Sequence, residues 1–272
     1  MKKREFGISV VIPTFNRTDT LLRAVDSVKT SHNNIVEIIV VDDGSDFDID
    51  AVVGKNNKYG VPVRTYRNST NKGPQVSRNL GIRRASYQFV AFLDSDDYFH
   101  SDKIDWALNI LTKQETDFLY HAVEGCEKYN KISSLWFKSF GKALHFRWFL
   151  CLLNPCVTPS VIIRTKRCLF NPTLRYAEDY AFLLSYIDSD TRVQYFDNLY
   201  TTVPRMIGTI GGVSGNLVKM RKGEIIGKRN LLRKHSISNF VQYVFSLVFT
   251  TARVISDLIR KRYTLVNFIK SK

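Results

Sequence analysis

Three carboxylates within four residues are the first feature of this sequence that could do chemistry. Asp94, Asp96 and Asp97, interrupted only by Ser95, follow the apolar run of residues 87–93. Like charges this close repel and raise one another's pKa, so such a cluster is typical of a cation site or of a solvated turn. Mg²⁺ and Mn²⁺ take oxygen ligands and often combine one or two carboxylates with substrate phosphates. We therefore expect a divalent-metal site here, with a solvated acidic turn as the alternative.

The segments around these acids alternate between strand and helix patterns. Short apolar runs predict strands at residues 8–12, 36–41, 61–66 and 87–93, and helical spacing predicts helices at residues 18–28 and 75–85. Apolar strands of this kind suit a sheet that is covered on both faces. We therefore predict an α/β fold with a Rossmann-like, mostly parallel central sheet flanked by helices.

The polar motifs fall where such a sheet binds its ligands. Ligands of open parallel sheets lie beyond the carboxyl ends of the strands. Residues 14–16 follow the first predicted strand, Asp42 and Asp43 follow the second, and the acid cluster follows the fourth. Asp42-Asp43-Gly44-Ser45 by itself is an ordinary turn signal.

The second half of the chain is less regular. Residues 101–111 and 177–187 read as helices and residues 160–164 as a strand, whereas the pattern of residues 123–145 assigns no element. Four glycines within residues 208–216 predict a mobile loop of the kind that forms active-site lids.

The last part of the chain predicts an amphipathic helix from residue 238. Its polar stripe consists of Gln242, Ser246, Thr250, Arg253, Asp257 and Lys261. Its wide apolar face consists of Phe240, Val244, Leu247, Val248, Ile255, Leu258 and Ile259. Such a helix packs on its own domain or lies in a membrane interface, and both possibilities stay open.

Composition and charge limit the class of protein. The 272 residues are 44% hydrophobic and 24% charged, which excludes a disordered or fibrous chain. The net charge is +15, and residues 200–272 hold 14 of the basic residues but only 2 acidic ones. A basic end attracts an anionic membrane or a nucleic acid.

The sequence offers no targeting peptide and no uninterrupted apolar membrane span. Its four cysteines form no CxxC pair, which predicts reduced thiols.

Other nucleotide enzymes and nucleic-acid binders fit the motifs poorly. The first strand is followed by Pro13-Thr14-Phe15-Asn16-Arg17, where a dinucleotide-binding oxidoreductase would have GxGxxG. The phosphate loop of an NTPase is also absent. A sugar-nucleotide pyrophosphorylase remains an alternative, although the glycine-rich turn that would cradle a triphosphate is missing. A basic nucleic-acid-binding protein is a weaker alternative, because no reading motif accompanies the charge.

The order of the motifs is more specific than any one of them. Residues 8–17, 40–45, 77–81, 92–97 and 177–179 together resemble the family 2 glycosyltransferases. These are inverting enzymes of the GT-A fold that use nucleotide-sugar donors. The resemblance is strongest over residues 7–111 and weaker over residues 155–190. One departure concerns the acceptor site, because Cys168-Leu169-Phe170-Asn171 stands where many members have Gly-Gly-Phe-Asp.

The resemblance implies a role for each motif residue. On the donor side, Pro13, Thr14 and Phe15 would line the nucleotide base, Asp43 would bind the uracil N3–H, Arg78 would lie near the base or diphosphate, and Asp94 and Ser95 would hold the ribose or donor sugar. Asp96 would ligate Mn²⁺ or Mg²⁺, and Asp97 would bind sugar hydroxyls or help the metal indirectly. Asp179 would be the catalytic base with Glu178 beside it in the substrate site, and Arg205 would meet the diphosphate.

The resemblance also implies a reaction and a setting. A metal would stabilise the leaving diphosphate of a UDP-sugar while Asp179 takes the proton of the attacking hydroxyl, so that the configuration is inverted. UDP-glucose or UDP-galactose is the expected donor. The expected acceptor is a polyprenyl-diphosphate-linked saccharide of O-antigen, capsule or exopolysaccharide assembly. We expect a cytoplasmic enzyme held peripherally on the inner membrane face by its basic end, without a nucleic-acid partner.

These inferences divide the chain into four parts. Residues 1–99 form the nucleotide-sugar-binding half, and residues 100–207 form the acceptor-binding half of the same GT-A domain. Residues 208–237 form the glycine-containing lid loop with a basic connector. Residues 238–272 form the amphipathic basic helix.

Overall fold

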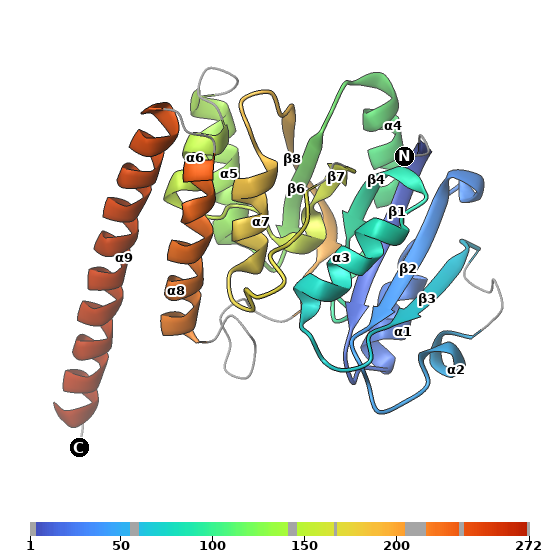
Figure 1. The fold of residues 1–272 in the computed structure, drawn as a ribbon, viewed down its shortest axis with the longest axis horizontal. Helices are drawn as coiled ribbons and strands as arrows, with labels where there is room; N and C mark the ends of the chain where they lie inside the picture. The colour runs from blue at the N-terminus through green and yellow to red at the C-terminus, as the bar shows by residue number, and fades with distance from the viewer. Residues whose placement is uncertain are drawn as a thin grey trace.

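The computed structural model describes residues 4–54, 60–140, 146–165, 168–204, 216–233 and 237–270. Within these residues, eight strands form one sheet in the order β3-β2-β1-β4-β7-β6-β8-β5 (Figure 1). Arg205 and residues 208–215, which carry most of the predicted lid loop, lie outside the described residues.

The first half of the sheet is parallel, as the sequence predicts. It consists of β1 (Glu5–Thr14), β2 (Val36–Asp42), β3 (Val63–Arg67) and β4 (Tyr87–Phe92). At the carboxyl end of this half, Thr14 is paired with Asp42. The strand ends that carry the polar motifs therefore meet at one edge of the sheet.

The second half of the sheet is mixed. It consists of β5 (Tyr98–Phe99), β6 (Phe118–Glu124), β7 (Ile162–Arg164) and β8 (Val193–Thr202). The short β7 runs antiparallel to both β4 and β6, whereas β8 runs parallel to β6 and antiparallel to β5. The predicted α/β fold with a helix-flanked sheet is confirmed, and its parallel character belongs mainly to the first half.

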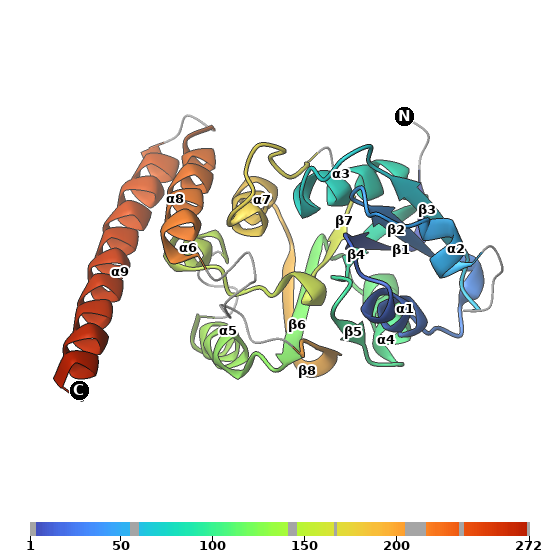
Figure 2. The same cartoon turned by 90° about the horizontal axis from the view of Figure 1, so that it is seen from below.

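Helices cover both faces of the sheet (Figure 2). One face carries α3 (Pro74–Arg84) and α7 (Glu178–Tyr186), and the other carries α1 (Asp19–Asp26) and α4 (Lys103–Lys113). Successive side chains of β1 point to opposite faces of the sheet. Val11 packs in one buried cluster, and Val10 and Ile12 pack in the other. The short α2 (Ile49–Val53) lies beside β3 at one end of the molecule. Two short 3-10 helices, η1 (Asn33–Ile35) and η2 (Thr158–Ser160), precede β2 and β7.

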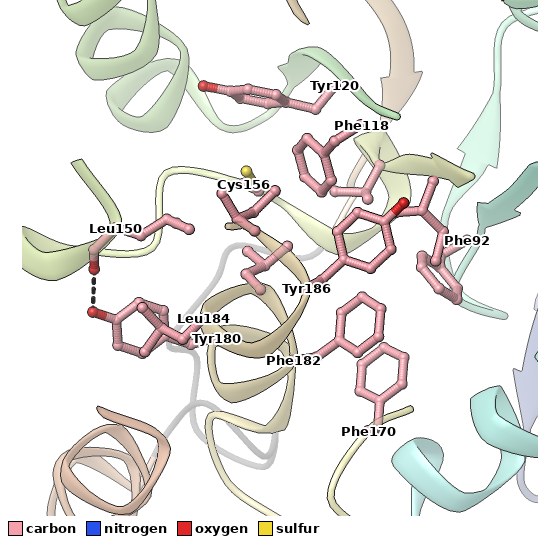
Figure 3. Close-up of a cluster of buried hydrophobic side chains, with 14 of the residues drawn as sticks. Phe92, Phe118, Tyr120, Leu150, Cys156, Phe170, Tyr180, Phe182, Leu184 and Tyr186 are labelled. Atoms are coloured by element: carbon pink, nitrogen blue, oxygen red, sulfur yellow. Dashed lines mark hydrogen bonds between the residues drawn. The ribbon is translucent and has the colours of Figure 1, made fainter. Parts of the chain in front are cut away.

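A cluster of aromatic side chains holds α7 against the sheet (Figure 3). The rings of Phe170 and Phe182 stack with centroids 4.1 Å apart, and Phe92 of β4 meets both rings edge-on. The hydroxyl of Tyr180 donates to the carbonyl of Leu150 in α6 (Phe146–Leu152). The region that the sequence left unassigned contains the end of β6 and α5 (Glu127–Phe140), which also packs on this cluster.

The last helices that the structure describes pack together. They are α8 (Leu217–Lys228), the 3-10 helix η4 (Arg229–Arg233) and α9 (Ile237–Lys270). Both views place α9 at the end of the molecule opposite α2 (Figures 1 and 2). The predicted amphipathic helix is present, and its polar stripe faces the protein, with Gln242, Ser246 and Thr250 at most 5% exposed. Within the described part of the chain, no helix has the length and apolar character to cross a membrane.

Candidate active site

Two loops at the carboxyl edge of the sheet are joined by hydrogen bonds. The loop after β1 holds the predicted base-lining residues, with Pro13 and Thr14 buried and Phe15 42% exposed. Asn16 adopts a left-handed backbone (φ 48°), and its side chain exchanges hydrogen bonds with Asp46 at 2.9 and 3.0 Å. The amide of Asp43 donates to the carbonyl of Thr14 at 2.8 Å. Phe15 therefore presents an exposed ring at the mouth of the site.

The carboxylate of Asp43 is buried in a ring of donors. It accepts hydrogen bonds from the Asn68 side chain at 2.8 Å, from the Lys72 amide at 3.1 Å and from the Gly73 amide at 2.7 Å. Gly73 has φ 95°, a left-handed conformation that glycine adopts without strain, and it precedes the first turn of α3. These contacts fix Asp43 at the end of β2, next to the loop that carries Phe15.

Arg78 ties two parts of the site together. Its guanidinium is 4% exposed and pairs with Oδ1 of Asp94 at 2.6 Å and with Oε1 of Glu178 at 3.1 Å. Burial lowers the pKa of Arg78, but the charges of Asp94 and Glu178 outweigh burial and raise it. The sequence predicts a contact with the base or diphosphate, and the structure gives Arg78 two carboxylate partners inside the site.

The acid cluster lies in the turn after β4. Ser95 and Asp97 are each 5% exposed, whereas the side chains of Asp94 and Asp96 are about one-third exposed. Burial, followed by the charges of Asp94 and Asp96, raises the pKa of Asp97 to about 8. The charges of Asp94 and Asp96 thus lie close enough to Asp97 to disfavour its ionisation.

Two arginines from outside the cluster hold Asp96. The guanidinium of Arg17 lies 2.5 Å from Oδ2 of Asp96, and the guanidinium of Arg23 donates to its carbonyl at 2.9 Å. Arg17 lies two residues after Phe15, within the motif that follows the first strand, so its position in the sequence was a usable signal. Arg23 lies on α1 and carries no comparable signal.

This donor set fits a divalent cation that is shared with a diphosphate. No group of three His, Cys, Asp or Glu side chains in the described residues could hold a metal without help. A diphosphate could supply the remaining oxygen ligands beside Asp96. The charges of Asp94 and Asp96, which act together with burial to raise the pKa of Asp97, are the negative charge that a cation would offset.

The carboxylates of Glu178 and Asp179 begin α7. Burial and the neighbouring charge of Asp179 raise the pKa of Glu178 to about 7, and burial raises the pKa of Asp179 as well. The residue before them, Ala177, adopts a left-handed backbone with φ 54°. That conformation costs a non-glycine residue about 1–2 kcal/mol, so the surrounding packing must hold it.

The packing that holds Ala177 comes from α8. A Cβ atom on Gly223 would lie 2.1 Å from the carbonyl of Tyr176, and one on Gly227 would lie 2.8 Å from the Cβ of Ala181. Only glycines allow α8 to approach the start of α7 this closely. No local pattern in the sequence indicates that these two glycines support the start of α7.

Asp179 has an orienting partner that the sequence did not reveal. The side-chain amide of Asn154 donates to Oδ2 of Asp179 at 2.9 Å, while its oxygen accepts from the Cys156 amide at 3.0 Å. Asn154 lies in the region before β7, 25 residues from Asp179, so no local pattern could have linked the two.

The segment Cys168-Leu169-Phe170-Asn171, which departs from the family pattern, is held in place through Phe170. Its backbone is held on both sides by Asn79, which donates to its carbonyl at 2.9 Å and accepts from its amide at 2.7 Å. Asn79 belongs to the same helix as Arg78. The segment of residues 168–171 is therefore anchored to α3 even without the usual glycines.

Comparison with known sequences identifies the type of chain. The family model described as glycosyl transferase family 2 matches residues 9–165. An uncharacterised glycosyltransferase of Rickettsia felis is 38% identical over 113 residues, 42% of this chain but 18% of that relative. The chain thus matches only about a fifth of the length of that relative. The Escherichia coli protein named UDP-Glc:alpha-D-GlcNAc-diphosphoundecaprenol beta-1,3-glucosyltransferase WfaP is 27% identical and covers 85% of this chain and 87% of its own.

Solved structures show the same fold. The structure of Staphylococcus aureus TarS residues 1–349 matches with a TM-score of 0.69 and 19% identity, covering 91% of this chain and 72% of that chain. A mannosyltransferase from Pyrobaculum calidifontis, solved with GDP-Man and Mn²⁺, matches with a TM-score of 0.63 and 11% identity over 96% of this chain and 80% of its own. At these identities the matches confirm the predicted GT-A fold alone.

Proposed function

The chain belongs to glycosyltransferase family 2 and is a transferase, and from that premise we propose the reaction it performs. It transfers a hexose from a UDP-sugar, with UDP-glucose or UDP-galactose as the first choice, to a hydroxyl of a polyprenyl-diphosphate-linked saccharide. The product is a unit of a bacterial surface polysaccharide. Two relatives support this choice of substrates. The name of the E. coli relative specifies UDP-Glc and a diphosphoundecaprenol acceptor, and that of a Campylobacter jejuni relative, 34% identical over 120 residues, specifies a PP-undecaprenol acceptor.

One observation carries the proposal: a single buried guanidinium binds both halves of the site. Arg78 contacts Asp94 in the acid cluster and Glu178 at the start of α7. The neighbours of these two residues are Asp96, the proposed metal ligand, and Asp179, the proposed base. A donor held at the acid cluster therefore lies close to the residue that would activate the acceptor.

The donor site is built from the strand ends of the parallel half. Phe15 offers an exposed ring against which a base can stack. We assign the uracil N3–H to the carboxylate of Asp43, which would take it as a further donor beside Asn68, Lys72 and Gly73. Asp94 and Ser95 would hold the ribose or donor sugar, and Asp97 would bind sugar hydroxyls. Mn²⁺ or Mg²⁺ held at Asp96 would offset the charge that develops on the leaving diphosphate.

Asp179 is suited to act as general base. Its raised pKa makes it a stronger base than an ordinary aspartate, and the hydrogen bond from Asn154 to Oδ2 orients the carboxylate toward an acceptor hydroxyl. Attack on the face opposite the leaving diphosphate in one displacement inverts the anomeric configuration. Glu178, already paired with Arg78, would keep Asp179 in place beside the acceptor sugar.

The acceptor also determines where the enzyme would work. A polyprenyl-diphosphate carrier remains in the membrane, so the enzyme would meet it at the inner face of the cytoplasmic membrane as a peripheral protein. The net positive charge of residues 200–272, with 14 basic and 2 acidic residues, would attract anionic lipids at that surface. The family assignment supports neither the pyrophosphorylase nor the nucleic-acid alternative.

Calorimetric titration of the purified chain with UDP, with and without Mn²⁺, tests the donor site. We expect metal-dependent UDP binding that is lost in Asp96→Ala and retained in Asp179→Asn, with transfer abolished in both variants. GDP or CDP binding in place of UDP would overturn the role of Asp43 as uracil selector. Transfer by Asp179→Asn at the rate of the unmodified enzyme would remove Asp179 as base.

A further inference from the structure

The helix α9 packs on the protein through its polar side. The stripe of Gln242, Ser246 and Thr250 is buried, with exposures of 5%, 0% and 1%. Arg253, one turn further on, lies 3.6 Å from Glu224 of α8. A helix on a water-soluble surface normally buries its apolar face and exposes its polar one, so α9 has the reverse orientation.

A buried lysine explains this orientation. The ammonium of Lys228, at the end of α8, is fully buried and donates to the carbonyl of Ser246 at 2.8 Å, to the hydroxyl of Thr250 and to the carbonyl of Cys151 in α6 at 3.2 Å. Turning α9 by half a revolution would place apolar side chains against this ammonium and remove two of its acceptors. Because an unpaired buried cation is costly, the polar stripe must face inward.

The apolar side of α9 is consequently left on the outside. Eight bulky side chains there are 44–85% exposed: Ile237, Phe240, Val241, Val244, Phe245, Val248, Ile255 and Ile259. Among the described side chains of α9, Arg253 is the one charged group, and it turns toward Glu224. Contiguous apolar surface of this kind marks a site of interaction with a partner or a membrane.

We propose that this outward face of α9 inserts into the headgroup–acyl boundary of an anionic lipid monolayer, with the helix lying in the plane of the membrane. The inference deepens the proposed function, on which it rests for the lipid setting, by naming the surface that meets the bilayer. Lys228 and the polar stripe then act as the clamp that keeps the apolar face turned outward.

Lipid fits this face better than a second copy of the chain does. Helix pairs in water usually border their apolar seam with Glu and Lys, which form salt bridges between the helices. Here Phe240 and Phe245 border the seam, and the apolar surface is wide. The sequence instead places a basic cluster, Arg260-Lys261-Arg262, directly after the apolar part, and such a cluster complements anionic headgroups.

The position of α9 also suits an acceptor carried by lipid. In Figure 1 the carboxyl ends of β1 and β2 point to the lower edge of the molecule, and α9 descends toward that same edge. A membrane on the outward face of α9 would cover the end of the molecule opposite α2. The edge that carries the active site would then stand beside the membrane, within reach of a lipid-linked acceptor.

Vesicle flotation without donor or acceptor tests the proposal. The full chain is mixed with vesicles of phosphatidylcholine and phosphatidylglycerol, and the double variant Val244→Glu/Val248→Glu is compared with Leu135→Glu/Leu199→Glu. The control pair is also exposed and apolar, at 55% and 48%, but lies on α5 and β8. We expect the α9 variant to lose vesicle binding by about tenfold or more and the control to bind as the unmodified chain does.

The outcomes separate this inference from the proposed reaction. The proposal that α9 inserts into lipid would be overturned if the α9 variant floated with vesicles as well as the unmodified chain does. It would also be overturned if the unmodified chain did not float. A dimer in sedimentation that Val244→Glu/Val248→Glu converts to monomer, without vesicle binding, would assign the face to a second copy instead. UDP titration of the same samples reports on the donor site independently, and equal melting temperatures show that the variants are folded.

Discussion

The side-chain amide of Asn154 donates a 2.9 Å hydrogen bond to Oδ2 of Asp179, and the amide cannot turn over without losing the Cys156 contact to its oxygen. This pair fixes the rotamer of the proposed base before any acceptor arrives. Asn154 contacts no reacting atom in this arrangement. It is a positioning residue.

Replacing Asn154 by Ala should therefore slow transfer without weakening donor binding. A positioned base contributes about 10²–10⁴-fold to a rate, and we expect loss of its orientation to remove about tenfold of that in kcat. Steady-state kinetics with saturating UDP-sugar, together with UDP titration, measure the two effects. A variant whose kcat matches that of the unmodified enzyme would show that Asp179 needs no such support.

Arg78→Met should destabilise the fold as well as the site. The substitution leaves Asp94 and the buried Glu178 without their shared cation, and removal of one partner from a buried ion pair costs about 3–5 kcal/mol. Urea unfolding measures the loss. Arg83→Met is the matched control, because Arg83 is exposed on the same helix. A loss confined to UDP affinity would instead assign Arg78 to the diphosphate.

The metal-free protein should lose stability as the pH rises from about 4 to about 8. Asp97 has a folded-state pKa of about 8, above its unfolded value of about 3.9, so the folded state binds the proton more tightly throughout this window. Ionisation of Glu178, whose pKa is about 7, acts in the same direction. Melting temperatures in chelator across this range, for the unmodified chain and Asp97→Asn, measure the effect.

Asp97→Asn should flatten that pH dependence, because the amide does not ionise. At about pH 8 the variant should melt at a higher temperature than the unmodified chain. At about pH 5 the difference in melting temperature should be small. Parallel curves for the two proteins would mean that Asp97 does not carry the effect.

Gly223→Ala should disturb the start of α7, because Gly223 lies on the side of α8 that contacts it. The new methyl group would meet the carbonyl of Tyr176, so the two helices must separate, which we expect to cost about 1–3 kcal/mol despite the better helix propensity of alanine. The melting temperature and kcat should both fall. Ile225→Ala, at an exposed position of the same helix, should change neither, and a Gly223→Ala protein more stable than its parent would contradict this packing.

The local pattern of the sequence was sufficient for the donor half. The strand ending at Thr14, the strand before Asp43 and the helix of Arg78 have their predicted places, because apolar periodicity and chain-breaking residues act within a few positions. The motif order led to the family and the GT-A fold, which the comparisons confirm. The roles of Pro13, Thr14, Phe15, Asp43, Asp94, Ser95, Asp96, Asp97, Glu178 and Asp179 remain predictions.

Contacts between distant segments were decided by the tertiary structure alone. Arg78 meets Glu178 across 100 residues, and nothing local tells a guanidinium which of several carboxylates it will pair with. The sequence likewise defined the polar stripe of α9 but not its direction, because hydrophobic periodicity says which residues share a face and not what that face meets. Its direction depends on Lys228, a buried cation on another helix that needs Ser246 and Thr250 as acceptors.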